Sequence, residues 1–242
     1  MKAGPFLWGA RTDIAVFGGS AGLAAILVAL GHATGWSDAP APAWMWLTLV
    51  LAVDVGHVWS TLARTYLDGE ELARRRLLYI GLPMVCWAVG VLLYRSSPLW
   101  FWRGLAYLAL FHFIRQQVGW VAIYRARAGD RSQSSRIVDD AAVYAATFYP
   151  VLVWHSKLPR QFEWFVVGDF LPLPMIEPWL LPLGWLYAAC LSAFAVHQLA
   201  RVWRTRSLEV GKWIVVGTTA LTWWLGIVAT KNPAQAEALG FA

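Results

Sequence analysis

The sequence has few charged residues for its length, and this shortage argues against a soluble domain. Only 14% of its 242 residues are Asp, Glu, Lys or Arg, whereas a soluble domain carries about a quarter. Apolar residues make up 59%, and the mean hydropathy is +0.51. The 17 tryptophans fit the same picture, because Trp concentrates at the two interfaces of a bilayer. We therefore predict an all-α, polytopic integral membrane protein.

Other absences remove particular classes of protein. Cys86 and Cys190 both fall within apolar runs, so no disulfide framework is indicated. No two histidines lie within five residues of each other, unlike in the HxxxH and HxxHH boxes of membrane desaturases and hydroxylases. The last apolar run has Lys212 and Lys231 only at its ends, so it lacks the mid-helix lysine of a retinal protein. The net charge of +6 comes from short basic loops between apolar runs, which indicates a membrane rather than a nucleic-acid partner.

Apolar stretches of spanning length, about 17–25 residues, predict seven transmembrane helices in a single domain covering residues 1–242. Their predicted ranges are 13–31, 43–64, 77–94, 98–124, 137–154, 179–203 and 212–230. The chain stops shortly after the last range without a basic tail, which suggests an eighth helix beyond residue 242. The first range also has a competing interpretation as a signal peptide, although its apolar run is longer than a usual signal.

The distribution of basic residues predicts the orientation of the helices. With seven helices, the N-terminus and the loops 65–76, 125–136 and 204–212 fall on one face with their helix ends. That face carries fifteen Lys and Arg residues against five on the other. Because short cytoplasmic loops are enriched in Lys and Arg, we predict a cytoplasmic N-terminus, in a bacterial cytoplasmic membrane.

A polar stripe marks the second predicted helix. Asp54, His57, Thr61, Arg64 and Asp68 follow one another at alternating spacings of three and four residues. On a helix this spacing puts all five side chains on one face. Ionisable residues are rare within membrane helices and usually mark a functional interior.

Polar residues of other predicted helices fall at similar depth in the cytoplasmic half of the membrane. From a helical rise of about 1.5 Å per residue, His57 and His197 lie about 10 Å from the boundary, and Tyr144 about 12 Å. Asp54, Arg115 and Gln116 lie about 14–15 Å deep, Asp140 about 6 Å, and His112 about 20 Å. We therefore expect the stripes of four helices to converge.

This convergence suggests a metal-dependent enzyme that oxidises or hydroxylates a lipophilic substrate reached from the bilayer. Imidazoles and carboxylates suit iron, zinc or copper. The candidate metal ligands are His57, His197 and His112. The candidate catalytic residues are Asp54, Arg115, Asp140 and Tyr144. Arg64 and Gln116 are the candidate substrate-binding residues, and membrane lipids are the expected surroundings.

Several polar residues also have a plainer interpretation. His57 and His197 would each bond to a neighbouring hydroxyl or carbonyl group. Asp54 and Arg115 would form a buried ion pair that holds two helices together, and Arg64, Arg201 and Arg204 would reach lipid phosphates. Asp139 and Asp140 would cap a helix N-terminus, and His155 would be an ordinary interface residue. Two other functions remain open: a transporter or proton-coupled carrier that uses the same cluster, and a structural subunit of a larger membrane complex.

Overall fold

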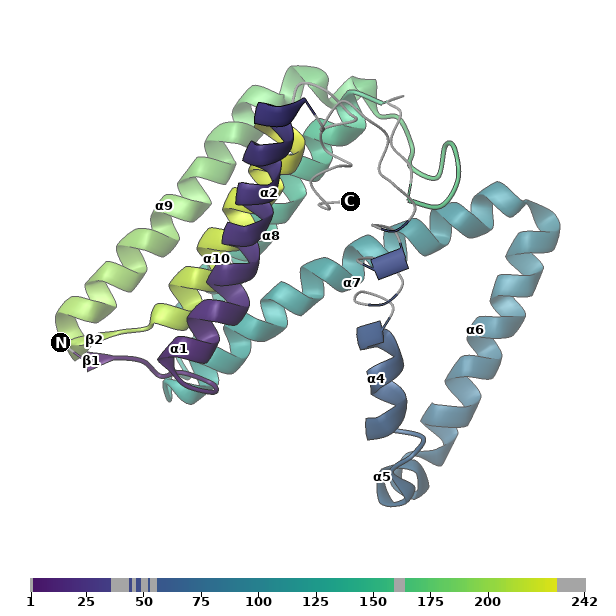
Figure 1. Cartoon of the computed structure of the whole chain (residues 1–242), viewed down its shortest axis with the longest axis horizontal. Helices are drawn as coiled ribbons and strands as arrows, with labels where there is room; N and C mark the ends of the chain where they lie inside the picture. The colour runs from purple at the N-terminus through teal and green to yellow at the C-terminus, as the bar shows by residue number, and fades with distance from the viewer. Residues whose placement is uncertain are drawn as a thin grey trace. The chain divides into compact units, whose positions relative to one another are not determined.

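The computed structural model describes residues 2–35, 44, 47–48, 52, 56–158 and 164–229, and these ranges are predominantly helical (Figure 1). The chain divides into two compact units. Unit 1 comprises Met1–Asp38 and Ala106–Ala242, and unit 2 comprises Ala39–Leu105. The all-helical prediction is confirmed, with a two-residue strand pair as the only addition among the described residues.

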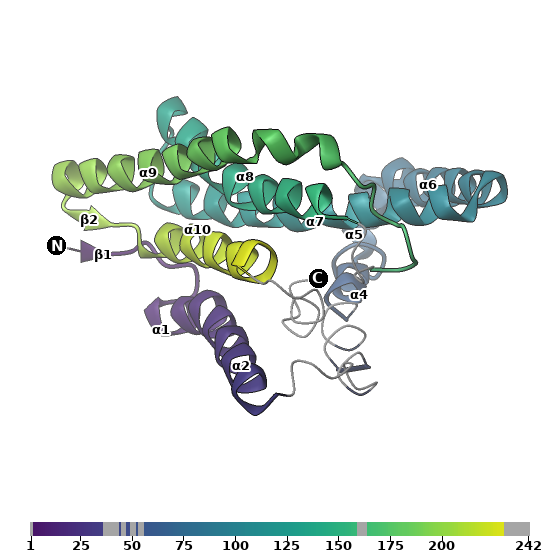
Figure 2. The same ribbon diagram turned by 90° about the horizontal axis from the view of Figure 1, so that it is seen from above.

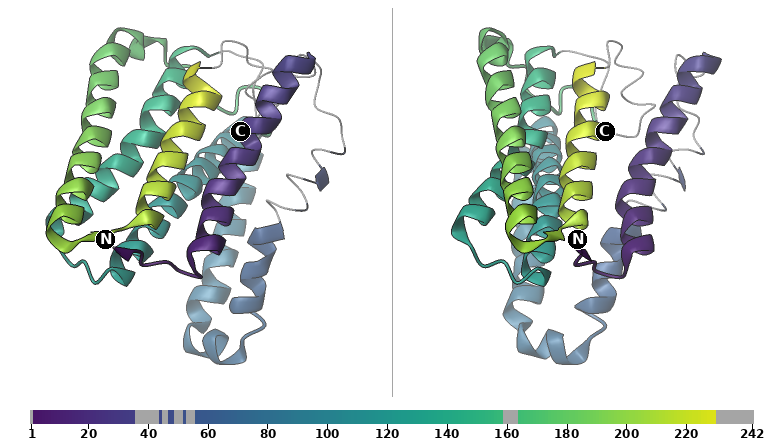
Figure 3. Two further views of the ribbon diagram at one scale, coloured as in Figure 1. Left: turned by 60° about the vertical axis from the view of Figure 1, so that its left-hand side comes forward. Right: turned by 90° about the vertical axis from the view of Figure 1, so that its left-hand side faces the viewer.

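Unit 1 holds the N-terminal helix and the C-terminal helices. Its elements are β1 (Lys2–Ala3), α1 (Ala10–Asp13), a π-helical segment (Ile14–Gly19), α2 (Ser20–Thr34), the greater part of α7 (Pro98–Arg127), α8 (Gln133–Ser156), a 3-10 helix (Pro174–Trp179), α9 (Leu180–Thr205), β2 (Ser207–Leu208), α10 (Val210–Trp223) and a second π-helical segment (Trp224–Ala229). Both α9 and α10 pack along α8 (Figures 2 and 3).

Unit 2 contains α4 (Gly56–Arg64), α5 (Gly69–Arg74), α6 (Arg76–Ser96) and the first turns of α7. Asp68 begins α5, because its carboxylate accepts the amide N–H of Glu70 and of Glu71, each at 3.1 Å. The hydroxyl of Tyr79 donates to Glu71 at 2.8 Å and thereby ties α5 to α6.

Five described helices are long and apolar enough to cross a membrane. They are Ala10–Gly31, Arg76–Ser96, Gln133–Ser156, Pro174–Thr205 and Val210–Ala229. In a bilayer, helices satisfy every backbone polar group internally, which is why apolar runs of this length fold this way. Helix α7 covers the predicted range 98–124 but is less apolar than these five. In the predicted range 43–64, most of residues 43–55 lie outside the described residues, and α4 covers the rest, Gly56–Arg64.

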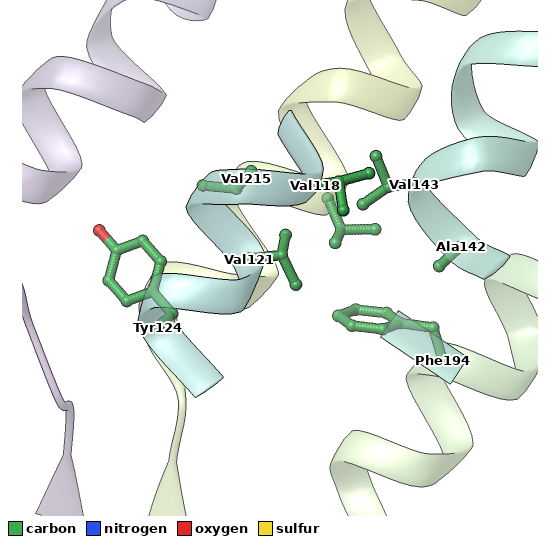
Figure 4. Packing of buried hydrophobic residues seen from close by; sticks show 8 residues of the cluster. Val118, Val121, Tyr124, Ala142, Val143, Phe194 and Val215 are labelled. Atoms are coloured by element: carbon green, nitrogen blue, oxygen red, sulfur yellow. The ribbon is translucent and has the colours of Figure 1, made fainter. Parts of the chain in front are cut away.

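The core of unit 1 lies where α7, α8, α9 and α10 meet. Val121, Ala142 and Val143 are fully buried there, and Phe194 packs against them (Figure 4). Lipid tails are as apolar as these side chains, so close packing, rather than escape from water, holds such helices together.

One end of unit 1 gathers three segments that are distant in the sequence. Strand β1 pairs in parallel with β2, so the N-terminal segment lies beside the connection between α9 and α10 (Figure 2). Arg201 at the end of α9 forms an ion pair with Asp130, which lies in the connection between α7 and α8. The structure therefore places these three segments at one end of unit 1.

Candidate functional site

The structure brings together two of the predicted catalytic residues, Arg115 and Tyr144. Arg115 lies on α7 and Tyr144 on α8, and the Arg115 Nη1 donates to the Tyr144 hydroxyl at 2.9 Å. The ring of Phe148, one turn further along α8, stacks on Tyr144 with centroids 5.6 Å apart. Arg115 is exposed on the surface of unit 1, although it lies well inside the predicted span.

Two other predicted site residues share the exposed surface of α7 with Arg115. Gln116 follows it directly and is exposed, and His112 precedes it by three residues and is also exposed. Spacings of three and four residues keep side chains on one helix face, so His112 and Arg115 are neighbours on α7.

The predicted residues of the second helix are only partly described. Asp54 lies outside the described residues, and so does the side chain of His57. Arg64 ends α4 and is exposed. These residues belong to unit 2 and are described separately from the Arg115–Tyr144 pair.

His197 lies at a different level of the bundle from Tyr144. Its Nε2 is 3.0 Å from the hydroxyl oxygen of Ser135, near the start of α8. Ser135 precedes Tyr144 by nine residues, which corresponds to about 13 Å along a helix. The structure thus brings Arg115 and Tyr144 together and separates His197 from them.

Within the described ranges, no group of three or more His, Cys, Asp or Glu side chains is arranged to hold a metal ion. The predicted ligand His57 was outside that search, because its side chain is not described. The metal site therefore stays a prediction.

Charged side chains meet where α7, α8, α9 and α10 begin or end, in what we call the helix-end network. Its members are the acidic residues Asp130, Asp139, Asp140 and Glu209 and the basic residues Arg125, Arg136, Arg201 and Lys212. Lys212 is fully buried, and its Nζ lies 2.9 Å from Asp139 Oδ2 and 2.8 Å from Glu209 Oε2. Such a group needs close partners, since an isolated buried charge is very unfavourable.

Two of the arginines in the helix-end network, Arg201 and Arg125, each contact two carboxylates. Arg201 contacts Asp130 at 2.9 Å and Glu209 at 2.6 Å. Arg125 lies 3.3 Å from Asp139 and 3.6 Å from Asp140. The second carboxylate oxygen of Asp139 accepts a hydrogen bond from Gln198 at 3.2 Å. These contacts connect the ends of four helices.

Several plainer interpretations change with these contacts. Asp139 and Asp140 do not cap α8, because the helix begins at Gln133 and the first turn is already complete before them. Arg201 faces two carboxylates instead of lipid phosphates. His155 is buried, with its Nε2 2.8 Å from the Tyr107 hydroxyl and its Nδ1 2.7 Å from the Val151 carbonyl.

A second buried carboxylate, Asp13, anchors the N-terminal segment. It accepts the amide N–H groups of Leu7 and Trp8 at 2.7 Å and 3.0 Å, and the hydroxyl of Tyr124 at 2.7 Å. Asp13 is fully buried, so these three bonds replace its hydration. It therefore ties the start of the first span to the end of α7.

Sequence reasoning missed Lys212, Glu209 and Asp13 as buried groups. The sequence predicts Lys212 and Glu209 in the short basic loop 204–212. Their three-residue spacing at a predicted helix start was an available signal, because oppositely charged residues at that spacing face each other. The hydroxyl of Tyr124 and the carboxylate of Asp13 are 111 residues apart in sequence. No local sequence pattern predicts a contact over that separation.

The surface of unit 1 also has an open apolar groove. It is lined by Tyr187, Ala220, Leu221 and Trp224. This lining has no charged group, so it suits contact with lipid tails and not the recognition of a polar ligand. The Arg115–Tyr144 pair is therefore the stronger candidate for a binding site.

Comparison with known proteins adds no assignment: no protein-family model matches the chain, and neither a curated protein nor a solved structure is significantly similar to it.

Proposed function

We propose that this chain is an integral membrane enzyme that acts on a lipophilic molecule, which reaches the Arg115–Tyr144 pair from the bilayer. The observation that carries the proposal is the exposed guanidinium of Arg115 on α7, hydrogen-bonded to Tyr144. A charge in the middle of a membrane helix costs about 2.5–3.5 kcal/mol on insertion scales. Such a residue is retained where it serves a site.

The helix-end network does not offer an equivalent site. Its central members, Lys212 and Asp139, are fully buried and lie 2.9 Å apart. A molecule in the bilayer has no access to them without separating α8 from α10. Arg115 is accessible and has one described bond, to the neutral Tyr144.

For the reaction, we propose a metal-dependent oxidation or hydroxylation. The support is the chemistry of the nearby and predicted residues, since imidazole and carboxylate groups suit iron, zinc or copper. His112 is a neighbour of Arg115 on α7, and Asp54 is predicted on the second helix at the depth of Arg115, about 14–15 Å, with His57 at about 10 Å. By its predicted depth of about 20 Å, His112 is the weakest ligand candidate, and the ring of His197 is engaged with Ser135 at 3.0 Å.

We further propose seven membrane spans with a cytoplasmic N-terminus, in a bacterial cytoplasmic membrane. The support is the excess of basic residues on one predicted face, together with the meeting of the N-terminal segment and the two basic connections at one end of unit 1.

Metal content tests the reaction class. The wild type, purified in detergent, is compared with a His57→Ala/His112→Ala variant and with a His57→Ala/His197→Ala variant. A His32→Ala variant is the control. About one equivalent of iron, zinc or copper in the wild type and the control, lost in either double variant, supports the proposal. A folded wild type without bound metal, after expression in medium that contains all three metals, contradicts it.

A structural or assembly role is the second candidate, and the helix-end network favours it. Polar groups that join the ends of four helices provide stability without any ligand. A subunit of this kind would be unstable when purified alone. A monomer that stays folded in detergent and binds a ligand at Arg115 would contradict the structural role. Flux of a solute across the membrane without bound metal would instead favour a transporter or proton-coupled carrier.

A further inference from the structure

We propose that Arg115 and Tyr144 bind the carboxylate of a lipophilic acid, such as a long-chain fatty acid. This inference rests on the proposed function, because it names the class of molecule that occupies the proposed site.

The charges of the helix-end network balance one another without Arg115. The helix-end network contains four acidic and four basic side chains, joined by ion pairs of 2.6 to 3.9 Å. Asp140, the acidic residue one turn from Tyr144 on α8, lies 3.6 Å from Arg125 and 3.7 Å from Arg136. The charge of Asp140 acts on Arg115 at longer range, but Arg115 forms no direct ion pair among the described residues. An anionic ligand would supply a direct partner for its guanidinium.

The hydrogen bonds of the pair suit an acceptor with two oxygens. Tyr144 accepts from Arg115 Nη1, so the phenol still has its own proton to donate. A guanidinium has about five N–H donors, and one of them is used in this bond. A carboxylate accepts from Arg115 and Tyr144 together, in the charge-assisted geometry that arginine favours.

The depth of Arg115 favours a single-chain acid over a phospholipid. Arg115 precedes Arg125 by ten residues, which is about 15 Å along a helix. Phospholipid phosphates stay in the interface, outside a hydrocarbon core about 30 Å thick. The carboxyl group of a free acid is smaller and neutral when protonated, and it can enter that depth and lose its proton beside Arg115.

Apolar side chains continue from Arg115 along the same face of α7. Phe111 and Leu108 precede Arg115 by four and seven residues, and both are exposed, at 55% and 66%. That spacing aligns the three side chains on one helix face. The hydrocarbon tail of the acid would lie along Phe111 and Leu108, with its head at Arg115 and Tyr144.

Oleate binding tests the inference. The whole chain is placed in nanodiscs of phosphatidylcholine, and the binding of labelled oleate is compared with that of oleyl alcohol and methyl oleate. We expect oleate to bind at least tenfold more tightly than either neutral molecule. Arg115→Gln should lower oleate affinity about tenfold or more, because it removes the charge-assisted hydrogen bond to the carboxylate. Tyr144→Phe should lower it by a smaller factor and keep the ring stack with Phe148.

Two further variants keep the test decisive. Arg136→Gln removes the same charge from a residue at the end of α8 and should leave oleate affinity unchanged. Arg115→Lys keeps the charge without the planar fork and should bind with intermediate affinity, which also serves if Arg115→Gln does not fold. Equal binding of oleate and oleyl alcohol, or an equal loss in Arg136→Gln and Arg115→Gln, overturns the proposal.

An Asp54→Asn variant tests whether a carboxylate of the protein, rather than a bound acid, neutralises Arg115. If this carboxylate neutralises Arg115 in the folded protein, the wild type will bind oleate weakly and Asp54→Asn will bind it more tightly, which overturns the proposal. Selective oleate binding by a wild type without metal would contradict the oxidation reaction and leave the acid site standing. A metal-loaded wild type with no preference for oleate would contradict the acid site and leave the oxidation reaction standing.

Discussion

At position 211, the first turn of α10 passes against the ring of Tyr124 with no room for a side chain. A Cβ atom on Gly211 would overlap the ring carbons of Tyr124. The ring cannot move easily, because Tyr124 is 1% exposed and its hydroxyl is bonded to Asp13 at 2.7 Å. One glycine hydrogen therefore permits the contact between α7 and α10.

We expect Gly211→Ala to destabilise the protein by about 1–3 kcal/mol, the usual effect of overpacking a core. Gly217→Ala, in the same helix, is the matched control, because a Cβ there meets nothing within 4 Å. The control should be neutral or slightly stabilising, since alanine favours helix more than glycine does. SDS-induced unfolding in mixed micelles measures both, and equal stabilities would show that Tyr124 shifts freely.

At the scale of the elements, the helix-end network connects α7, α8, α9 and α10 through charges. Removing one partner of a buried ion pair leaves the other charge without compensation, which usually costs about 3–5 kcal/mol. Replacing both partners by groups without charge often restores much of the loss. The position of Lys212 between Asp139 and Glu209 makes it the most sensitive member.

Lys212→Met should therefore lower the stability by about 3–5 kcal/mol, measured by the same unfolding assay. The double variant Lys212→Met/Asp139→Asn should be more stable than the sum of the two single changes predicts. Arg136→Gln should have little effect, because its side chain is 71% exposed and exposed ion pairs contribute little. Additive losses in the double variant would show that Lys212 and Asp139 are not coupled.

The contacts of Asp130, in the connection between α7 and α8, predict that the stability of the protein falls in acid. Burial raises the pKa of Asp130, but hydrogen bonds from Ser135 and from the Ser132 amide, with the charges of Arg201 and Lys212, bring the pKa below its usual 3.8. Because the folded pKa is the lower one, this stabilisation is present above pH 3.8 and is lost as the pH falls through the folded value. Asp130→Asn should be less stable than the wild type at neutral pH, and the difference should shrink below pH 3.8. A constant difference across that range would contradict the assignment.

At the scale of the whole molecule, the orientation in the membrane is the main prediction. The connection at Ser132 and the turn at Ser207 lie at one end of unit 1, and Lys157, at the end of α8, lies at the other. In Figure 3 the two ends of α8 lie at opposite ends of the bundle formed by α8, α9 and α10. With a cytoplasmic N-terminus, Ser132 faces the cytoplasm and Lys157 faces outward.

Single cysteines at Ser132, Ser207 and Lys157, in a chain without Cys86 and Cys190, test this orientation. A membrane-impermeant maleimide should label Lys157→Cys in intact cells. It should label Ser132→Cys and Ser207→Cys only in inverted vesicles. The reverse pattern would invert the orientation, and labelling of Ser132 and Ser207 from opposite sides would contradict the arrangement of unit 1.

The membrane class and the helical fold are readable from the sequence alone. Long apolar runs with few charges have one stable form in a bilayer, because every backbone polar group must be satisfied within its own helix. This reason holds for each run separately, so the helices from Arg76, Pro98 and Gln133 onward begin within four residues of their predicted positions. The helical rise also predicts that Arg115 and Tyr144 are polar residues at comparable depth.

The partner of each polar residue was decided only by the tertiary structure. Periodicity identifies which side chains share a face of one helix, but it does not determine how far that helix is rotated or shifted against its neighbours. Packing sets the rotation: the ring of Tyr124 fits over Gly211 and thereby places α10 so that Lys212 faces Asp139. The same packing places Arg115 beside Tyr144 and His197 beside Ser135. These contacts join residues far apart in the chain, and their energies depend on several helices at once.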